Sequence, residues 1–165
     1  MLQLATKLRN LILRIAGALG WLPPTLARLC VGWVFFQSGW GKLHNLPQVT
    51  EYFQSLGLPA PAFQAALAST TELVCGGLLL VGLLTRIASV PLIITMTVAI
   101  LTAKKEELTG FSALYGFIEY LYILLMVYLG VQGPGPLSLD QLLVKRFVKP
   151  AEEPGTATAA AKRIA

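Results

Sequence analysis

Four long apolar segments separated by short polar connections dominate the hydropathy pattern of this chain. The segments span residues 24–43, 62–84, 87–103 and 114–131, and each approaches the roughly 20 residues that a helix needs to cross about 30 Å of hydrocarbon. The third is the shortest, and Pro91 lies in its first turn, where a missing backbone N–H is tolerated. The pattern predicts an all-α fold, an integral membrane four-helix bundle.

The segments outside these spans carry patterns of their own. Leucine and isoleucine recur on one helical face of the first twenty residues, opposite Lys7, Asn10 and Arg14. This predicts an amphipathic helix on the membrane surface, with a cleaved signal peptide as the alternative. Residues 43–61 predict a short amphipathic helix that caps one mouth of the bundle, followed by a Gly/Pro breaker run.

These patterns divide the chain into three parts. We assign residues 1–22 to the amphipathic interfacial helix and residues 23–148 to the four-span transmembrane domain. Residues 149–165 are rich in Ala, Thr, Glu and Pro and lack hydrophobic periodicity, which predicts a disordered cytoplasmic tail.

Composition agrees with a membrane protein, and charge predicts its orientation. Hydrophobic residues make up 55% of the chain and charged residues 13%, with a mean hydropathy of +0.68, which is outside the range of soluble domains.

Ten basic residues belong to one side of the predicted bundle and three, Lys42, Lys104 and Lys105, to the other. The positive-inside rule therefore places both termini in the cytoplasm. The net charge of +5 then reflects topology and attraction to membrane lipid, and nothing in its distribution indicates nucleic acid binding.

A stripe of cations and small residues runs along the first span. Arg28, Gly32, Phe35, Gly39 and Lys42 share one helical face. Because a charge facing hydrocarbon is costly, this face should point at protein, with the two glycines admitting a close neighbour. In the second span, Gly76 and Gly77 are expected to serve helix packing in the same way.

Polar residues inside the spans gather on the outer half. Glu72 lies halfway along the second span, Glu119 lies in the fourth with Tyr115 and Tyr122 on its face, and Lys42 and His44 end the first. They predict an outward-facing pocket with Glu72 as the catalytic candidate. Arg28, Lys42, His44, Glu119, Tyr115 and Tyr122 are the candidates for binding a substrate or partner. A carboxylate at this depth should pair with a cation or hold a proton.

Each candidate also has a structural interpretation. Glu72 is then a hydrogen-bonding partner that holds helices together, and Glu119 is solvated at the interface. In this view Lys42 and Arg28 are snorkelling anchors, and His44 is a solvated loop residue.

The sequence contains no cofactor motif. It has no haem-ligand pair, no dinucleotide-binding loop and no cysteine cluster, and His44 has no second ligand at metal-binding spacing. Cys30 and Cys75 lie on different spans and are expected to be packing residues. We therefore expect no cofactor or metal bound by this chain itself, although the aromatic residues of the first and fourth spans suit a slot for a quinone ring.

Three motifs together carry a family resemblance. The first is the stripe from Arg28 to Lys42, and the second runs from Glu72 through Gly76-Gly77 to Gly82-x2-Thr85-Arg86. The third is the post-helix segment Gly133-Pro134-Gly135-Pro136-Leu137-Ser138-Leu139-Asp140. Because the three motifs occur in this order over residues 24–143, the chain resembles the DoxX family of small bacterial four-helix membrane proteins. The family-typical positions are Arg28, Gly39, Lys42, Glu72, Gly76, Arg86, Gly133, Gly135 and Asp140. Pro136 replaces a residue that is often basic, and Ser138 suits the N-cap of a helix over 139–147.

The resemblance implies a location in the bacterial inner membrane and three competing functions. The family is related to the DoxD subunit of thiosulfate:quinone oxidoreductase, which favours an accessory subunit of a quinone-linked or sulfur/thiol redox system. Such a subunit needs a membrane or periplasmic redox partner protein that carries the electrons. Distant relatives act as membrane chaperones or cargo receptors, so a non-catalytic assembly partner is the first alternative. A small-molecule or proton-coupled transporter is the second; four spans are few for it unless the chain forms a homo-oligomer.

Overall fold

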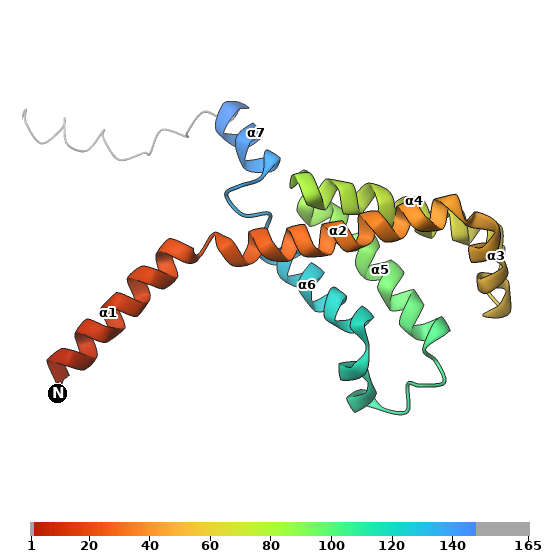
Figure 1. Cartoon of the computed structure of the whole chain (residues 1–165), viewed down its shortest axis with the longest axis horizontal. Helices are drawn as coiled ribbons and strands as arrows, with labels where there is room; N and C mark the ends of the chain where they lie inside the picture. Colours follow the sequence, from red (N-terminus) through yellow and green to blue (C-terminus); the bar gives the residue numbers. More distant parts are fainter. Residues whose placement is uncertain (1, 148–165) are drawn as a thin grey trace, which may run out of the picture.

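The computed structural model describes residues 2–147, and these form helices joined by short connections. In chain order the elements are α1 (Leu2–Leu19), α2 (Leu22–His44), α3 (Leu46–Ser55), α4 (Pro61–Val81), α5 (Thr85–Ala103), the 3-10 helix η1 (Phe111–Gly116), α6 (Ile118–Gln132) and α7 (Leu139–Phe147). Figure 1 shows α3 at one end of the bundle, with α1 and α7 toward the other. We refer to these as the α3 end and the α7 end. The all-α membrane helical bundle predicted from the sequence is confirmed.

Two helix pairs form the bundle. Helix α2 packs mainly against α4, and α5 packs mainly against α6. Figure 1 shows that α5 and α6 leave the α2–α4 pair at an angle, while α1 extends away from the bundle. A core of buried apolar side chains joins the pairs: Val31, Phe35, Cys75, Leu79, Ala88, Leu92, Met96 and Met126.

Glycines bring α2 and α4 into backbone contact. A Cβ atom on Gly39 would lie 2.7 Å from the Cα atom of Leu73, and one on Gly32 would lie 2.9 Å from the backbone nitrogen of Leu80. A Cβ atom on Gly76 would lie 2.5 Å from the backbone nitrogen of Phe36. Gly77 differs, because its added Cβ would meet only the Phe36 side chain, at 3.6 Å. The close approach brings the side chains of α2 and α4 near the α3 end into direct contact.

The segment before and within α7 is tied to the turn between α4 and α5. The carboxylate of Asp140 accepts hydrogen bonds from the backbone nitrogens of Leu84 (2.9 Å) and Thr85 (3.4 Å), and the Asp140 nitrogen donates to the Gly82 carbonyl (3.0 Å). Asp140 therefore caps the first turn of α5, where backbone N–H groups lack helical partners. The Oγ atom of Ser138 accepts a hydrogen bond from the Gln141 nitrogen (3.3 Å), which confirms its predicted role as N-cap of α7.

The helix boundaries correct two sequence predictions. Helix α5 begins at Thr85, where Asp140 caps it, so Pro91 lies in its second turn and not its first. The fourth predicted segment is broken, because η1 ends at Gly116 and Phe117 adopts an extended backbone (φ −93°, ψ 125°) before α6 begins. At 15 residues, α6 and not α5 is the shortest of the four main helices.

Three described segments are long and apolar enough to cross a membrane. They are Ala5–His44, within which α2 lies, Pro61–Val81 and Thr85–Ala103, and Ile118–Gln132 is a shorter apolar helix. The predicted tail over residues 149–165 lies outside the described residues.

Candidate functional site

An ion pair between α2 and α4 lies at the centre of the site. The Nζ atom of Lys42 lies 2.6 Å from Oε1 and 2.7 Å from Oε2 of Glu72, and the Ser38 hydroxyl donates to Oε2 at 2.8 Å. The Glu72 side chain is only 1% exposed, whereas that of Lys42 is 34% exposed. Both carboxylate oxygens of Glu72 are therefore occupied, and the ammonium of Lys42 reaches the pair from a more open position.

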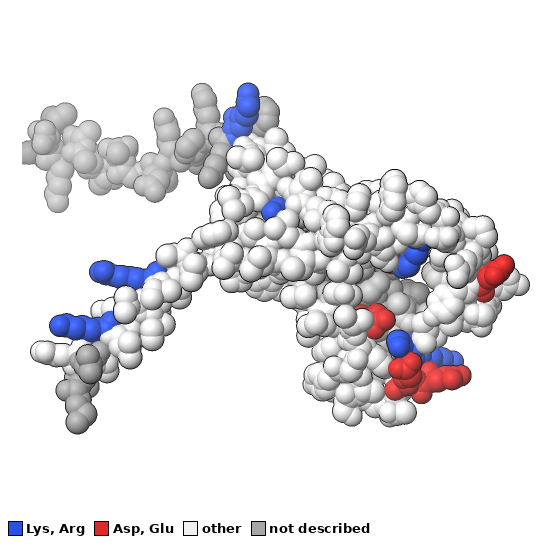
Figure 2. Space-filling model, in the orientation of Figure 1, with Lys and Arg blue, Asp and Glu red and all other residues white. Residues whose placement is uncertain are grey.

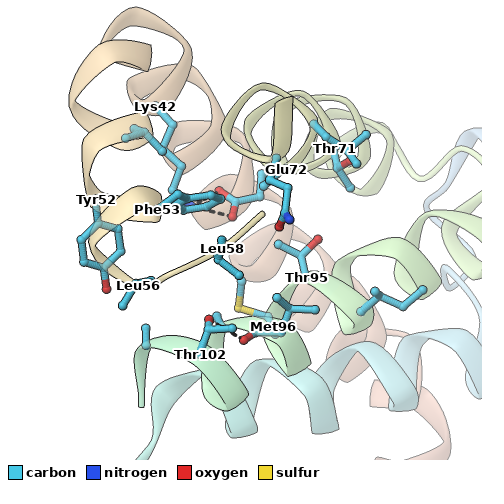
Figure 3. A pocket seen from close by; sticks show the side chains of 18 of the residues that line it. Lys42, Tyr52, Phe53, Leu56, Leu58, Thr71, Glu72, Thr95, Met96 and Thr102 are labelled. Atoms are coloured by element: carbon cyan, nitrogen blue, oxygen red, sulfur yellow. Dashed lines mark hydrogen bonds and ion pairs between the residues drawn. The ribbon is translucent and has the colours of Figure 1, made fainter. Parts of the chain in front are cut away.

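Beside this ion pair lies a pocket of about 1060 Å³ at the α3 end. Figure 2 shows a hollow at this end of the molecule, with positive and negative side chains around it. The pocket walls come from α3, from the connection that follows it, and from α4 and α5, and Glu119 joins them from α6. Figure 3 shows Lys42 and Glu72 linked at one side of the space, with Phe53, Leu58 and Met96 around it. The wall is mainly apolar, and its charged groups are Lys42, Glu72 and Glu119.

Glu119 offers the pocket a carboxylate oxygen that is not already engaged. Its Oε2 atom is buried and has no hydrogen-bond partner among residues 2–147. A buried acceptor without a partner is costly, so this oxygen is suited to accept a hydrogen bond from a ligand. It differs in this respect from Glu72, which is fully occupied.

The other predicted binding residues lie away from the pocket wall. His44 is exposed, and its Nδ1 atom lies 2.9 Å from the Trp40 carbonyl oxygen. Tyr115 lies on η1 with 70% of its surface exposed. Tyr122 packs edge-to-face on Phe35, with ring centroids 5.5 Å apart. The structure therefore brings the ammonium and the two carboxylates to the pocket wall, and it leaves the imidazole of His44 exposed at the end of α2.

Arg28 lies at the α7 end, far along α2 from Lys42. It is 3% exposed, and its Nη2 atom donates to the Leu137 carbonyl at 2.8 Å. Its Nε and Nη1 atoms have no hydrogen-bond partner among the described residues. Gly82 leaves room for this guanidinium, because a Cβ atom there would overlap it. Arg28 thus fastens the segment before α7 to α2 and takes no part in the pocket.

Sequence reasoning missed Ser38 and the pocket wall on α5. Ser38 precedes Lys42 by four residues, so the helical period places both on one face of α2, and this spacing was a usable signal. Thr95, Met96 and Thr102 of α5 also line the pocket. Their contribution depends on the angle between α5 and α4, for which the sequence carries no comparable signal.

No group of three or more His, Cys, Asp or Glu side chains in the described part of the chain is placed to hold a metal ion. Cys30 is exposed, Cys75 is buried, and both are free. The chemistry that this site offers is therefore that of one ammonium and two carboxyl groups at the edge of an apolar space.

Comparison with known proteins assigns the chain to a family. The DoxX family model matches residues 24–105. The chain is also 39% identical over 137 residues to "Uncharacterized membrane protein Rv3486" of Mycobacterium tuberculosis, an alignment that covers 75% of this chain and 84% of that protein. The chain belongs to the DoxX family. No solved structure matches this DoxX protein.

Two further relatives of this DoxX chain have names that bear on function and location. It is 33% identical over 121 residues to "Putative oxidoreductase CatD" of Bacillus subtilis, covering 73% of this chain and 86% of the relative. It is 29% identical over 132 residues to "Inner membrane protein YqjF" of Escherichia coli, an alignment that covers 74% of this chain and 92% of that relative. With its apolar helices, the DoxX chain is thus a membrane protein. The family model spans α2 to α5 and ends before Glu119.

Proposed function

We propose that this DoxX protein is the quinone-binding accessory subunit of a membrane redox system. The observation that carries the proposal is the pocket, a space of about 1060 Å³ with apolar walls and a small set of charged groups. Ligand sites of this kind use apolar walls for affinity and a few convergent polar groups for orientation. A quinone has the matching chemistry, because its flat ring is apolar and its two carbonyl oxygens accept hydrogen bonds.

Lys42 is the group that would orient the ring. Its ammonium has three donors, and Glu72 engages it through two short contacts. The remaining donor is free to meet a quinone carbonyl in the pocket. Glu72 then acts as a positioning residue, since it holds the ammonium at the pocket edge and balances its charge.

Glu119 is the group that would exchange protons. Reduction of a quinone to a quinol takes two electrons and two protons. The electrons come from a partner protein that oxidises a thiol pair or thiosulfate, because this chain has no motif for an electron-carrying cofactor. The protons pass one after the other through the unengaged oxygen of Glu119, which water at the α3 end reprotonates. The sequence favoured Glu72 for this role; the geometry favours Glu119, since both Glu72 oxygens are engaged.

The name of the Bacillus subtilis relative supports a redox role, and the charge distribution along the sequence supports cytoplasmic termini. In that orientation the α3 end faces the periplasm, where the partner protein docks. Membrane lipid is then the solvent for the apolar outer faces of α2, α4, α5 and α6.

Binding of a decylated benzoquinone to the purified protein in lipid nanodiscs tests the proposal. We expect saturable binding that survives Glu119→Gln, with quinone reduction lost in that variant and kept in Glu107→Gln, because Glu107 undergoes the same change in charge at an exposed site. In a second arm, quinone reduction is measured with thiosulfate or a dithiol as donor, before and after adding the proteins that co-purify. Turnover that requires those proteins and Glu119 supports the proposal. A folded protein without saturable quinone binding overturns it and favours an assembly partner.

A further inference from the structure

Part of the rim of the pocket lies between two helices, on the outer surface of the bundle. Five large side chains that line the pocket are also strongly exposed: Tyr52 on α3, at 52%, and four apolar residues on α4 and α5. Phe63 is 67% and Leu67 is 55% exposed on α4, while Ile94 is 58% and Val98 is 41% exposed on α5. A side chain that both lines a pocket and faces outward marks the rim of an opening. The rim therefore includes apolar residues from α4 and α5, with Tyr52 at the α3 end.

The opening follows from how the two helix pairs are arranged. A short connection joins α4 to α5 near the α7 end, where Asp140 ties the turn down. Toward the α3 end, α5 leaves the α2–α4 pair at an angle (Figure 1). The contacts of α4 with α5 are accordingly sparser than those of α4 with α2 or of α5 with α6. The apolar core includes Leu79 of α4 with Leu92 and Met96 of α5, and Met96 also lines the pocket beside the ion pair.

In a membrane, lipid would surround this part of the rim. Both α4 and α5 are long and apolar enough to span a membrane, and the four apolar rim residues lie within them. Leu67 and Ile94 are well inside their helices, away from the first and last turns. An aqueous ligand would have to cross hydrocarbon to use this route, whereas a lipophilic one would enter directly from the bilayer.

We infer that the pocket takes its ligand sideways from the bilayer and that the ligand carries a long apolar chain, which leaves through the gap between α4 and α5. The polar head lies against Lys42 and Glu119, and the chain passes the part of the rim formed by Phe63, Leu67, Ile94 and Val98. This inference rests on the proposed quinone site and narrows its ligand to membrane-resident quinones with an isoprenoid-like or alkyl tail.

The chain offers two matched controls. Val74 follows Leu67 by seven residues on α4, and Ile87 precedes Ile94 by seven on α5, so each pair shares one helical face. Val74 is 52% exposed and Ile87 is 65% exposed, and neither lines the pocket. A tryptophan at Leu67 or Ile94 fills the opening, whereas a tryptophan at Val74 or Ile87 adds the same bulk to the outer surface alone. All four positions are exposed, so the substitutions leave the buried core intact.

Photolabelling in nanodiscs tests the inference. The probe is a benzoquinone with a decyl chain that ends in a diazirine, and a ring-free fatty alcohol with the same chain and diazirine is the comparison. We expect the quinone probe to label peptides that contain residues 63–67 and 94–98. Labelling should fall roughly tenfold or more in Leu67→Trp and Ile94→Trp, because the added ring occupies the space of several methylene groups. It should be unchanged in Val74→Trp and Ile87→Trp.

Each outcome separates the inference from the proposed function. The first outcome is that a methylated quinone without a long chain binds as tightly as the decylated one, and that Leu67→Trp changes the affinity of neither. This result overturns the lateral opening, but the proposed quinone site remains. Equal labelling by the ring-free alcohol identifies a lipid acyl-chain site and overturns the inference. Loss of an oligomeric state in Leu67→Trp identifies the gap as an interface between copies and overturns it as well. Absence of saturable binding by either quinone removes the proposed function itself.

Discussion

The ammonium of Lys42 contacts both carboxylate oxygens of Glu72, at 2.6 and 2.7 Å. The pair joins α2 to α4 where Gly39 allows their backbones to touch. Packing and electrostatics are coupled here, because the close approach of the helices is what brings a residue late in α2 within reach of the middle of α4. The same coupling fixes the charged edge of the pocket.

Glu72→Gln tests this coupling. The substitution leaves the partly buried ammonium of Lys42 without its counter-charge, and breaking one partner of a buried pair typically costs about 3–5 kcal/mol. Since the Lys42 side chain is 34% exposed, we expect a smaller loss, on the order of 1–3 kcal/mol. The change is measured as a lower midpoint of thermal unfolding in nanodiscs.

The double variant Lys42→Met with Glu72→Gln is the control for that experiment. It removes the unpaired charge together with the carboxylate, so we expect it to recover much of the lost stability. Quinone binding should be weakened in the double variant, because the Lys42 ammonium that orients the ring is gone. A double variant as unstable as Glu72→Gln alone would show that the carboxylate acts through Ser38 and the helix contact and that its pairing with Lys42 contributes little.

Gly39→Ala tests the helix contact directly. A Cβ atom at this position would fall 2.7 Å from the Leu73 Cα atom and from the Ser69 carbonyl oxygen, so α2 and α4 must separate to admit it. We expect strong destabilisation and loss of quinone binding, because the separation also moves Lys42 from Glu72. The readouts are the yield of folded protein and the unfolding midpoint.

Gly77→Ala provides the matched comparison on α4. Its added methyl would meet only the Phe36 ring, at 3.6 Å, and alanine is more favourable than glycine in a helix by up to about 1 kcal/mol. We therefore expect unchanged or slightly higher stability. If Gly39→Ala and Gly77→Ala behaved alike, the backbone contact between α2 and α4 would not be what sets the stability of this helix pair.

The sequence predicted those parts of the structure that depend on periodicity along one helix. The face shared by Gly32, Gly39 and Lys42 followed from the helical period, and the structure has that face of α2 against α4. The amphipathic pattern of residues 43–61 likewise predicted α3 and its place at a mouth of the bundle. The N-cap of α7 followed from Ser138 and the Gly/Pro turn before it.

The sequence did not predict features that depend on angles between helices. Tyr122 shares the apolar segment of Glu119, and only the rotation of α6 decides that it packs on Phe35 while Glu119 lines the pocket. The break at Phe117 was missed because hydropathy runs unbroken through residues 114–131, although the backbone there turns extended. The lateral opening depends on the angle between α4 and α5.

Asp140 contributes to stability from outside the bundle core. Its two carboxylate oxygens accept from successive backbone nitrogens at the start of α5, as a helix cap does. We expect Asp140→Ala to cost about 0.5–2 kcal/mol and Asp140→Asn to cost less, since the amide keeps one acceptor oxygen. Thermal unfolding of the three proteins gives the order. No loss in Asp140→Ala would show that water replaces the cap at no cost.

The orientation of the bundle is a prediction that cysteine labelling decides. In a background with Cys30→Ser and Cys75→Ser, a single cysteine is placed at Gln54 on α3 or at Asn10 on α1, both of which are exposed. Ten of the thirteen basic residues belong with the termini in the predicted topology, so the positive-inside rule puts α3 on the periplasmic side. A membrane-impermeant maleimide should then label Gln54→Cys in intact spheroplasts and Asn10→Cys only after lysis. The reverse pattern would place the mouth of the pocket in the cytoplasm, and the redox partner would then have to be a cytoplasmic protein.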